Sequence, residues 1–435
     1  MVESGIHRFT LAQRGSTPFA TAIAFLLILC VWGVPSAAVN WNLIGDGYLP
    51  NLSDANQQGD SSAPSITVDL DGNLVVAWQQ GLMGIRRIMV SRWTGGEWQE
   101  LGSSQGSKAP SQDGQSEYLP SISMGLHGDI WLTGQSHQED GSSVVFIRKY
   151  DGDQWHTLAG SSPGGGITET RGATGLSACL VDDQESPILM WNEGLGLSIN
   201  ANVARLSTST WTLIGGRPIE GWECYEMLSG GSNRGRVPIL ICGKYSFGQD
   251  QELLVQYDVM SRSGENWSSL SRSMNTPLFT RLAPRASRNK PTACISDDSL
   301  YVAWLERDGE GSDRWSVNIL RYHNGMWEPL GPRAQIYCGR GIGHEIALAA
   351  ADGELYVAWF EEVESRGSYS QLIVRCFDGD EWSDVSGGFD EGILTQRGLS
   401  TYPLLALNEG SVYLVWQQLF EEGWRIRVAR GSSKE

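Results

Sequence analysis

The residues best placed for chemistry in this chain occupy one polar position that recurs after a series of apolar runs. Each run ends in Trp or in a residue that replaces it, and a polar side chain follows two positions later. These residues are Gln80, Ser136, Glu193, Lys244, Glu306, Glu361 and Gln418. Polar side chains presented together by a rigid scaffold can line a ligand site, although a strand that leaves a core also simply becomes polar. We take all of them except Ser136 as candidate binding residues and call the full set the polar ring.

Carboxylates gather in the segments that follow these positions. The groups are Glu139 with Asp140, Glu306 with Asp308 and Glu310, Glu361 with Glu362 and Glu364, and Glu421 with Glu422. Paired carboxylates roughly 5–10 Å apart can hydrolyse glycosidic bonds, and such groups can also bind calcium, but acidic loops of an acidic protein are commonly just solvated. An enzyme hypothesis would therefore depend on Glu306 and Glu361, with His137 as the histidine best placed for acid–base work.

Other chemical signatures are weak. The segment 69–73 (DLDGN) looks like part of a calcium loop, but an Asp-Gly turn explains it as well. The chain has no G-x-S-x-G, P-loop or H-E-x-x-H motif. It also has no CxxC pair, so we expect no metal site and no cofactor. Cys224 and Cys242 flank one predicted hairpin and either form a disulfide or remain free, since their geometry is not fixed by sequence.

The candidate positions recur because the whole chain repeats. Tryptophan returns at steps of 55 to 60 residues, at Trp41, Trp98, Trp155, Trp211, Trp267, Trp327 and Trp382. In one unit, residues 65–69 alternate as a strand does, Asp71-Gly72 marks a hairpin turn, and residues 74–78 form an apolar strand. Residues 88–93 give a third strand, and Trp98 opens a fourth. The unit is four antiparallel strands, and a period of this length indicates a repeat architecture.

The two ends of the chain indicate how the repeats close. The last unit has only three strands. At the start of the repeat region, residues 41–45 (WNLIG) resemble a fourth strand that has no unit of its own. Four-stranded units of this kind stack radially as propeller blades. We predict an all-β, seven-bladed β-propeller over residues 39–435, a single domain closed by its N-terminal strand, which completes the last blade and hides two sheet edges. We label the four strands of a unit A to D in chain order. The tight A–B and C–D turns share one face of the ring. The longer B–C and D–A loops share the other face, which we call the long-loop face.

The unit reads much like PSI…DG…VAW…W.G..W..LG, and it resembles secreted bacterial β-propellers of the broad sialidase-like group over nearly all of residues 39–435. Sialidases carry Asp-boxes in the turn between the third and fourth strands. Gly95, Gly152, Gly264 and Gly379 match the box, while Trp93, Tyr150, Arg262 and Phe377 stand where its Asp belongs. The resemblance also implies six blades and an arginine triad with a Tyr–Glu pair, whereas this chain has seven units and no early RIP-like motif.

Residues 1–38 have the layout of a secretory signal peptide: Arg8 and Arg14 precede an apolar run over about residues 20–34, and small residues follow at 36–38. An uncleaved anchor is the alternative. We expect a secreted, periplasmic or cell-surface protein that has no membrane contact after cleavage. The net charge of −18 repels phosphate backbones, so we expect no nucleic-acid partner, and it suits a soluble monomer.

The leading hypothesis is a non-enzymatic propeller that binds a glycan or a protein on its long-loop face. The first alternative is a glycoside hydrolase, sialidase-like enzyme or lyase that uses loop carboxylates and arginines. Two carboxylates and an arginine cluster converging in one pocket would favour it. The second alternative is a structural or interaction module of a cell-surface assembly. Fold alone does not choose among them, because propellers carry many unrelated functions.

Overall fold

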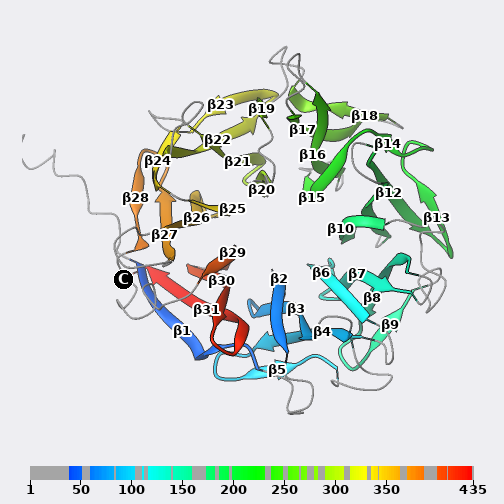
Figure 1. The fold of residues 1–435 in the computed structure, drawn as a ribbon, viewed down its shortest axis with the longest axis horizontal. Helices are drawn as coiled ribbons and strands as arrows, with labels where there is room; N and C mark the ends of the chain where they lie inside the picture. The colour runs from blue at the N-terminus through cyan, green and yellow to red at the C-terminus, as the bar shows by residue number, and fades with distance from the viewer. Residues whose placement is uncertain are drawn as a thin grey trace, which may run out of the picture. The chain divides into compact units, whose positions relative to one another are not determined.

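The chain folds into seven antiparallel sheets arranged around a ring (Figure 1). The computed structural model describes residues 39–433 apart from 51–58, 83–84, 103–109, 112–115, 139–140, 159–172, 182–185, 195–197, 231–236, 248–252, 264–265, 272–278, 283–289, 308–313, 331–334, 341, 363–369, 387–398 and 409. The predicted signal peptide lies outside the described residues. Among the described residues, no helix is long and apolar enough to cross a membrane.

Each blade has four main strands, which we call A to D from the inside of the ring outward (Figure 1). Blade 1 is β2 (Asp60–Val68), β3 (Leu74–Leu82), β4 (Ile85–Trp93) and β5 (Trp98–Glu100). Blade 2 is β6 (Ser116–Met124), β7 (Ile130–His137), β8 (Ser143–Tyr150) and β9 (Trp155–Thr157). Blade 3 is β10 (Ala173–Val181), β11 (Pro187–Glu193), β12 (Asn200–Ser207) and β13 (Thr210–Leu213). Blade 4 is β15 (Glu223–Gly230), β16 (Val237–Phe247), β17 (Leu253–Ser263) and β18 (Asn266–Ser269). Blade 5 is β20 (Thr292–Ser296), β21 (Ser299–Arg307), β22 (Arg314–His323) and β23 (Met326–Pro329). Blade 6 is β25 (Ile342–Ala351), β26 (Glu354–Glu362), β27 (Ser370–Phe377) and β28 (Trp382–Asp384).

Blade 7 confirms the predicted closure of the ring. It consists of β29 (Ser400–Asn408), β30 (Ser411–Phe420), β31 (Gly423–Ser433) and, as its D strand, β1 (Val39–Tyr48). The pairing of β1 with β31 is antiparallel and runs from Val39 opposite Ser433 to Tyr48 opposite Arg427, with a bulge on the way. The first strand of the described chain therefore completes the last blade, and the seven-bladed all-β fold is as predicted.

Two details differ from the sequence prediction. Short strands β14 (Ile219–Glu220), β19 (Phe279–Leu282) and β24 (Gln335–Arg340) pair with the C strands of blades 3, 4 and 5. They cover the part of each C strand that the short D strand leaves unpaired, which would otherwise be an open edge. In addition, the B–C connections of blades 1 and 7 are tight hairpins and not long loops, since Leu82 pairs with Ile85 and Phe420 pairs with Gly423.

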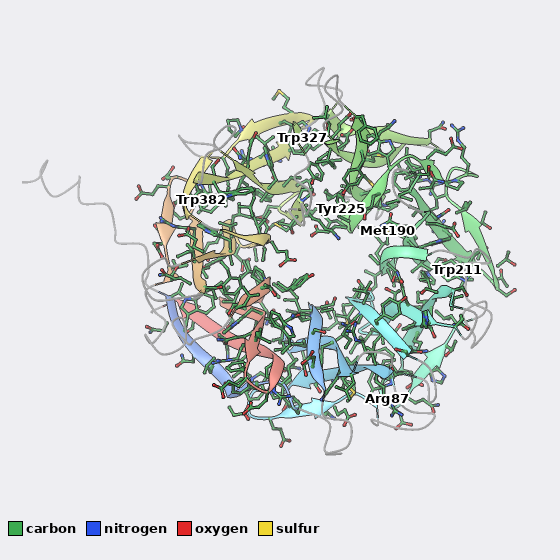
Figure 2. All side chains as sticks on the ribbon, in the orientation of Figure 1. Arg87, Met190, Trp211, Tyr225, Trp327 and Trp382 are labelled. Carbon is green, nitrogen blue, oxygen red and sulfur yellow. A yellow bond between two sulfur atoms is a disulfide. The ribbon has the colours of Figure 1, made fainter. Side chains whose placement is uncertain are left out.

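The repeated tryptophans link neighbouring blades through hydrogen bonds as well as apolar packing. In four blades the indole Nε1 donates a hydrogen bond to a backbone carbonyl of the preceding blade. That carbonyl belongs to the residue three positions after the preceding blade's own repeated Trp. The pairs are Trp41 to Val385 (2.9 Å), Trp155 to Leu101 (2.8 Å), Trp267 to Ile214 (3.4 Å) and Trp327 to Leu270 (3.1 Å). Figure 2 shows Trp211, Trp327 and Trp382 on the outer part of the ring. The spacing in the sequence motif thus joins four of the blades to the blade before them.

The residues that replace the Asp of the Asp-box pack against these tryptophans. Ring centroids lie 5.4 Å apart for Trp93 and Trp98, and 5.1 Å apart for Tyr150 and Trp155. Phe377 and Trp382 form the same pair at 5.2 Å. Each pair is a direct cross-strand neighbour on the C and D strands. An aromatic pair therefore replaces the carboxylate at the turn, which explains the degenerate box.

A second row of contacts between blades involves the residue immediately after the B-strand tryptophan. Gln79 Oε1 accepts the backbone N–H of Leu119, and Gln417 Oε1 accepts that of Ala63, each at 3.1 Å. Leu119 and Ala63 have φ angles of 53° and 49° at bulges of the A strands of blades 2 and 1. The bulge leaves an N–H outside the ladder, and the amide of the neighbouring blade satisfies it.

Candidate functional site

The structure places the polar ring at the ends of the B strands, one residue per blade, on the long-loop face. Its members differ in exposure: Gln80, Ser136 and Gln418 are buried, Glu193, Glu306 and Glu361 are partly buried, and Lys244 is exposed. Burial of three members means that the ring is not a uniform polar surface. Its role in binding stays a prediction.

Several ring members form hydrogen bonds inside their own blades. Glu361 Oε1 accepts from Trp359 Nε1 at 2.8 Å, and Gln80 Oε1 accepts from Trp78 Nε1 at 3.3 Å. The other partners are Asn202 Nδ2 for Glu193 (3.3 Å), Asn318 Nδ2 for Glu306 (3.2 Å) and Arg427 Nη1 for Gln418 (3.3 Å). Burial raises the pKa of Glu193, which Asn202 partly offsets. These side chains thus help to fix the ends of the B strands.

The other candidates have separate surroundings. Asp69 Oδ1 accepts the backbone N–H groups of Asp71 (3.0 Å) and Asn73 (2.8 Å), and its Oδ2 lies 3.0 Å from Arg92 Nε. Its carboxylate organises the turn, as the Asp-Gly interpretation predicts. His137 is exposed at the end of β7. Glu139, Asp140, Asp308, Glu310 and Glu364 lie outside the described residues.

The densest arrangement of functional groups on this face lies on blade 4. We call Tyr225, Glu226, Tyr245, Tyr257 and Lys290 the blade-4 cluster. Figure 2 shows Tyr225 on the inner side of the ring, on β15. Its hydroxyl lies 3.1 Å from that of Tyr245, and its ring centroid lies 5.9 Å from that of Tyr257. Three tyrosines from strands A, B and C therefore meet at one end of the blade.

Local backbone features make room for this cluster. Tyr225 sits at a bulge of β15, between the pairs Cys224–Cys242 and Glu226–Ile241. Gly243 leaves room for the side chain of Tyr225, since a Cβ at position 243 would come 2.5 Å from Tyr225 Oη. Directly beside the bulge, Cys224 and Cys242 form a disulfide between paired positions of β15 and β16. The disulfide that the sequence left open is formed, and it fixes the hairpin that carries the cluster.

Charged groups border the tyrosines. Lys290 Nζ lies 5.3 Å from the ring centroid of Tyr225, within the range of a cation–π interaction. Glu226 Oε2 accepts the backbone N–H of Ala293 at 2.8 Å and so connects blade 4 to blade 5. Lys244 lies next to Tyr245 on β16, on the opposite face of that strand. Its Nζ lies 6.0 Å from the ring centroid of Trp222. Two of the five lysines of the chain thus lie at this end of blade 4.

Burial sets the protonation of these groups. It raises the pKa of Glu226 from 4.5 to about 7, against the opposing effects of Thr292, Ala293 and Lys290. Burial also raises the pKa of the Tyr225 and Tyr245 hydroxyls, so both remain protonated at neutral pH. The tyrosines can therefore donate hydrogen bonds to a ligand, and Glu226 changes its charge near neutral pH.

An aromatic ring extends from the cluster into solvent. Phe247 lies two residues after Tyr245 on β16, on the same face of that strand, and is 64 % exposed. Sequence reasoning missed the tyrosines and Lys290 as candidate binding residues. The available signals were the irregular spacing of this unit and the two lysines. Sequence reasoning also missed the amides after the B-strand tryptophan, although the pairs Trp78-Gln79 and Trp416-Gln417 repeat.

The described residues do not bring two carboxylates and an arginine cluster into one pocket. Arg148 forms a buried bidentate ion pair with Glu117, with Nη2–Oε1 at 2.5 Å and Nη1–Oε2 at 2.7 Å. Arg427 is buried between Gln418, the polar-ring member of blade 7, and Tyr48. Both arginines are used inside the scaffold. Within the described part of the chain, no group of three or more His, Cys, Asp or Glu side chains could hold a metal ion.

Comparison with known proteins gives matches of structure only. No family model matches the chain, and no curated protein matches its sequence. A polysaccharide lyase described as a PL25 ulvan lyase, bound to -[GlcA(1-4)Rha3S]-, is similar with a TM-score of 0.51 and 10 % identity, over 89 % of this chain and 95 % of that one. A protein of unknown function from Dyadobacter fermentans has a TM-score of 0.44 at 10 % identity, and the match covers 92 % of this chain and 100 % of that one. A Trypanosoma rangeli sialidase has a TM-score of 0.41 at 10 % identity, and the match covers 90 % of this chain and 59 % of that one.

The predicted resemblance holds at the level of the fold. The structural neighbours include sialidases and polysaccharide lyases. At 10 % identity the likeness supports the architecture and not an activity.

Proposed function

We propose that the protein binds a glycan at the long-loop end of blade 4 and that it does so without turning it over. The observation that carries the proposal is the exposed ring of Phe247 beside the Tyr225–Tyr245 hydroxyl pair. A sugar needs an apolar surface for its ring faces and hydrogen-bond groups for its hydroxyls, and aromatic residues with polar tips supply both. Lys290 adds a cation at the same edge.

The arrangement supports binding more directly than catalysis. The tyrosine hydroxyls stay protonated, and the carboxylates of the polar ring form hydrogen bonds inside their own blades. A hydrolase that follows the usual scheme needs two carboxyl groups facing each other across a bond, whereas Glu226 accepts the backbone N–H of Ala293 and connects blade 4 to blade 5. A lectin-like module needs a fixed aromatic surface, and the disulfide next to Tyr225 makes this one rigid.

The experiment is a glycan-array screen of the protein with three variants. Phe247→Ala and Lys290→Met should each weaken binding of a captured glycan roughly tenfold, because each removes a contact at the centre of the site. Met326→Ala is the control, since Met326 is 68 % exposed on the C–D turn of blade 5, on the other face. If Phe247→Ala binds like the wild type, the blade-4 site is wrong. A triple Gln80, Glu306 and Glu361 variant then asks whether the polar ring is the site.

One observation favours a second candidate, a lyase. Glu226 titrates near neutral pH beside Lys290 and Tyr225, and a group with a pKa near 7 can act as a general acid or base. The structural likeness to an ulvan lyase makes acidic polysaccharides the first substrates to try. Ultraviolet absorbance of an unsaturated product, lost in Glu226→Gln, would replace the binding proposal with this one.

We also propose that residues 1–38 direct export and that the mature protein is a monomer. Cell fractionation with N-terminal sequencing tests the first point, and light scattering tests the second. A protein partner in place of a glycan would show itself as a silent array and a stoichiometric complex with another chain.

A further inference from the structure

A cavity of about 280 Å³ lies between blades 2 and 3, on the face opposite the blade-4 cluster. It is bordered by the A–B turn of blade 2, which contains Gly125 and Asp129, and by Thr208 from the C–D turn of blade 3. The two blades are neighbours in the ring (Figure 1). No part of the proposed glycan site contributes to it, so the cavity needs an explanation of its own.

The cavity is amphipathic. Apolar side chains from both blades form much of its wall, among them Leu126, Trp131, Val181 and Leu206. Lys149 and Asp129 are also part of the lining, and Lys149 Nζ lies 2.7 Å from Asp129 Oδ2. Both of these side chains are about one third exposed, at 34 % and 30 %. An ion pair that is exposed to this degree contributes little to stability, so it can exchange its internal contact for a ligand at small cost.

A buried donor in the wall has no acceptor. Trp131 is 4 % exposed, and its indole Nε1 has no hydrogen-bond partner among the residues that the structure describes. Gly125 faces this nitrogen, since a Cβ at position 125 would lie 3.0 Å from it. Buried indole N–H groups are normally paired, as those of Trp155 and Trp327 are here, whereas those of Trp98 and Trp191 are also unpaired among the described residues. The Trp131 nitrogen is itself buried under Gly125, so a bound molecule reaches it only if the turn that contains Gly125 shifts.

We propose that this cavity binds a small zwitterion, a free α-amino acid with an apolar side chain. Its carboxylate would pair with Lys149, its ammonium group would pair with Asp129, and its side chain would pack against the apolar wall. A lone anion would meet Asp129 and a lone cation would meet Lys149, whereas a zwitterion matches both charges. The volume suits a ligand of this size, below the range of drug-sized molecules.

The test is isothermal titration calorimetry of the full protein with L-leucine and L-phenylalanine. We expect saturable binding, and we expect the N-acetyl amides of the same amino acids, which carry neither charge, to bind at least tenfold more weakly. Lys149→Met retains the aliphatic stem over Trp131 and should also weaken binding at least tenfold. Asp129→Asn should do the same, and it leaves the backbone hydrogen bond of its turn in place because that bond uses the Asp129 carbonyl.

Arg321→Met is the matched control. Arg321 is also a C-strand cation in an exposed ion pair, with Glu328 at 2.5 Å, but it belongs to blade 5. It should leave the affinity unchanged. The proposal is overturned if neither amino acid saturates up to about 10 mM, if the N-acetyl amides bind as well as the free amino acids, or if both Lys149→Met and Asp129→Asn bind like the wild type. Thermal unfolding of each variant separates loss of the site from loss of the fold.

Discussion

The hydrogen bonds between repeated tryptophans and the preceding blade should have a measurable free energy, and the chain offers a matched pair to measure it. Trp327 donates its indole N–H to the carbonyl of Leu270 at 3.1 Å. Trp98 occupies the same repeat position, but its Nε1 has no hydrogen-bond partner among the described residues. Both are partly buried, and each packs against a C-strand aromatic, at 5.0 Å for Tyr322 and 5.4 Å for Trp93.

Phenylalanine at either position keeps an aromatic ring and removes the N–H. At Trp327 the change also leaves the carbonyl of Leu270 without its donor. A neutral hydrogen bond contributes about 0.5–1.5 kcal/mol net, and an abandoned buried acceptor costs about 1–3 kcal/mol. We therefore expect Trp327→Phe to lower the free energy of unfolding by about 1–2 kcal/mol more than Trp98→Phe.

Equilibrium urea unfolding followed by circular dichroism measures the difference. The slope of free energy against urea should be the same for both variants, so that the shift in midpoint reports stability alone. Equal losses in the two variants, or a larger loss for Trp98→Phe, would show that the tryptophans act through packing only. Trp155→Phe extends the series to a more deeply buried donor, with its 2.8 Å bond to Leu101.

Three further predictions concern the contacts around blade 4. Asn192 binds both the N–H and the carbonyl of Cys224 from the neighbouring blade, at 2.8 and 2.7 Å, so Asn192→Leu should cost about 2–4 kcal/mol in urea unfolding. Replacing Cys224 and Cys242 with serine removes a cross-link over 18 residues and should cost about 3 kcal/mol, and a reductant should then affect the wild type but not the variant. Because the pKa of Glu226 is raised to about 7 in the fold, its contribution to stability is fully present below pH 4.5 and is lost as pH rises towards 7. Glu226→Gln should remove that loss in unfolding experiments across this pH range, and an unchanged pH profile would contradict the shift.

The architecture could be read from the sequence because each blade repeats the same local signals. The Asp-Gly turns and the apolar strands are local signals, the tryptophan period repeats them every 55 to 60 residues, and the split last unit predicts the closure of the ring. The extra strands β14, β19 and β24 could not be predicted in this way. They depend on how a connecting segment returns along a C strand, which no periodic signal records.

The functional surface was harder to predict because it depends on which side of a strand faces which neighbour. Gln79 and Gln80 are adjacent polar residues, yet Gln79 binds the next blade while Gln80 binds a tryptophan of its own. The regular polarity of the second position predicted a binding role for it, but three members of the polar ring are buried. The tyrosines of blade 4 meet because of a bulge at Tyr225 and a glycine at 243, and these are departures from the repeat.

Closure by β1 also has a consequence for the order in which the molecule can be completed. The partner of Val39 is Ser433, so the first strand of the described residues to be synthesised pairs with the last of them. At typical rates of synthesis, roughly 5–20 residues per second, β1 waits tens of seconds for β31. During that time it is an unpaired strand with an apolar face, in need of protection from other chains. A chain that lacks β31 would leave β1 without its partner, so the ring closes only after the residues of β31 have been made.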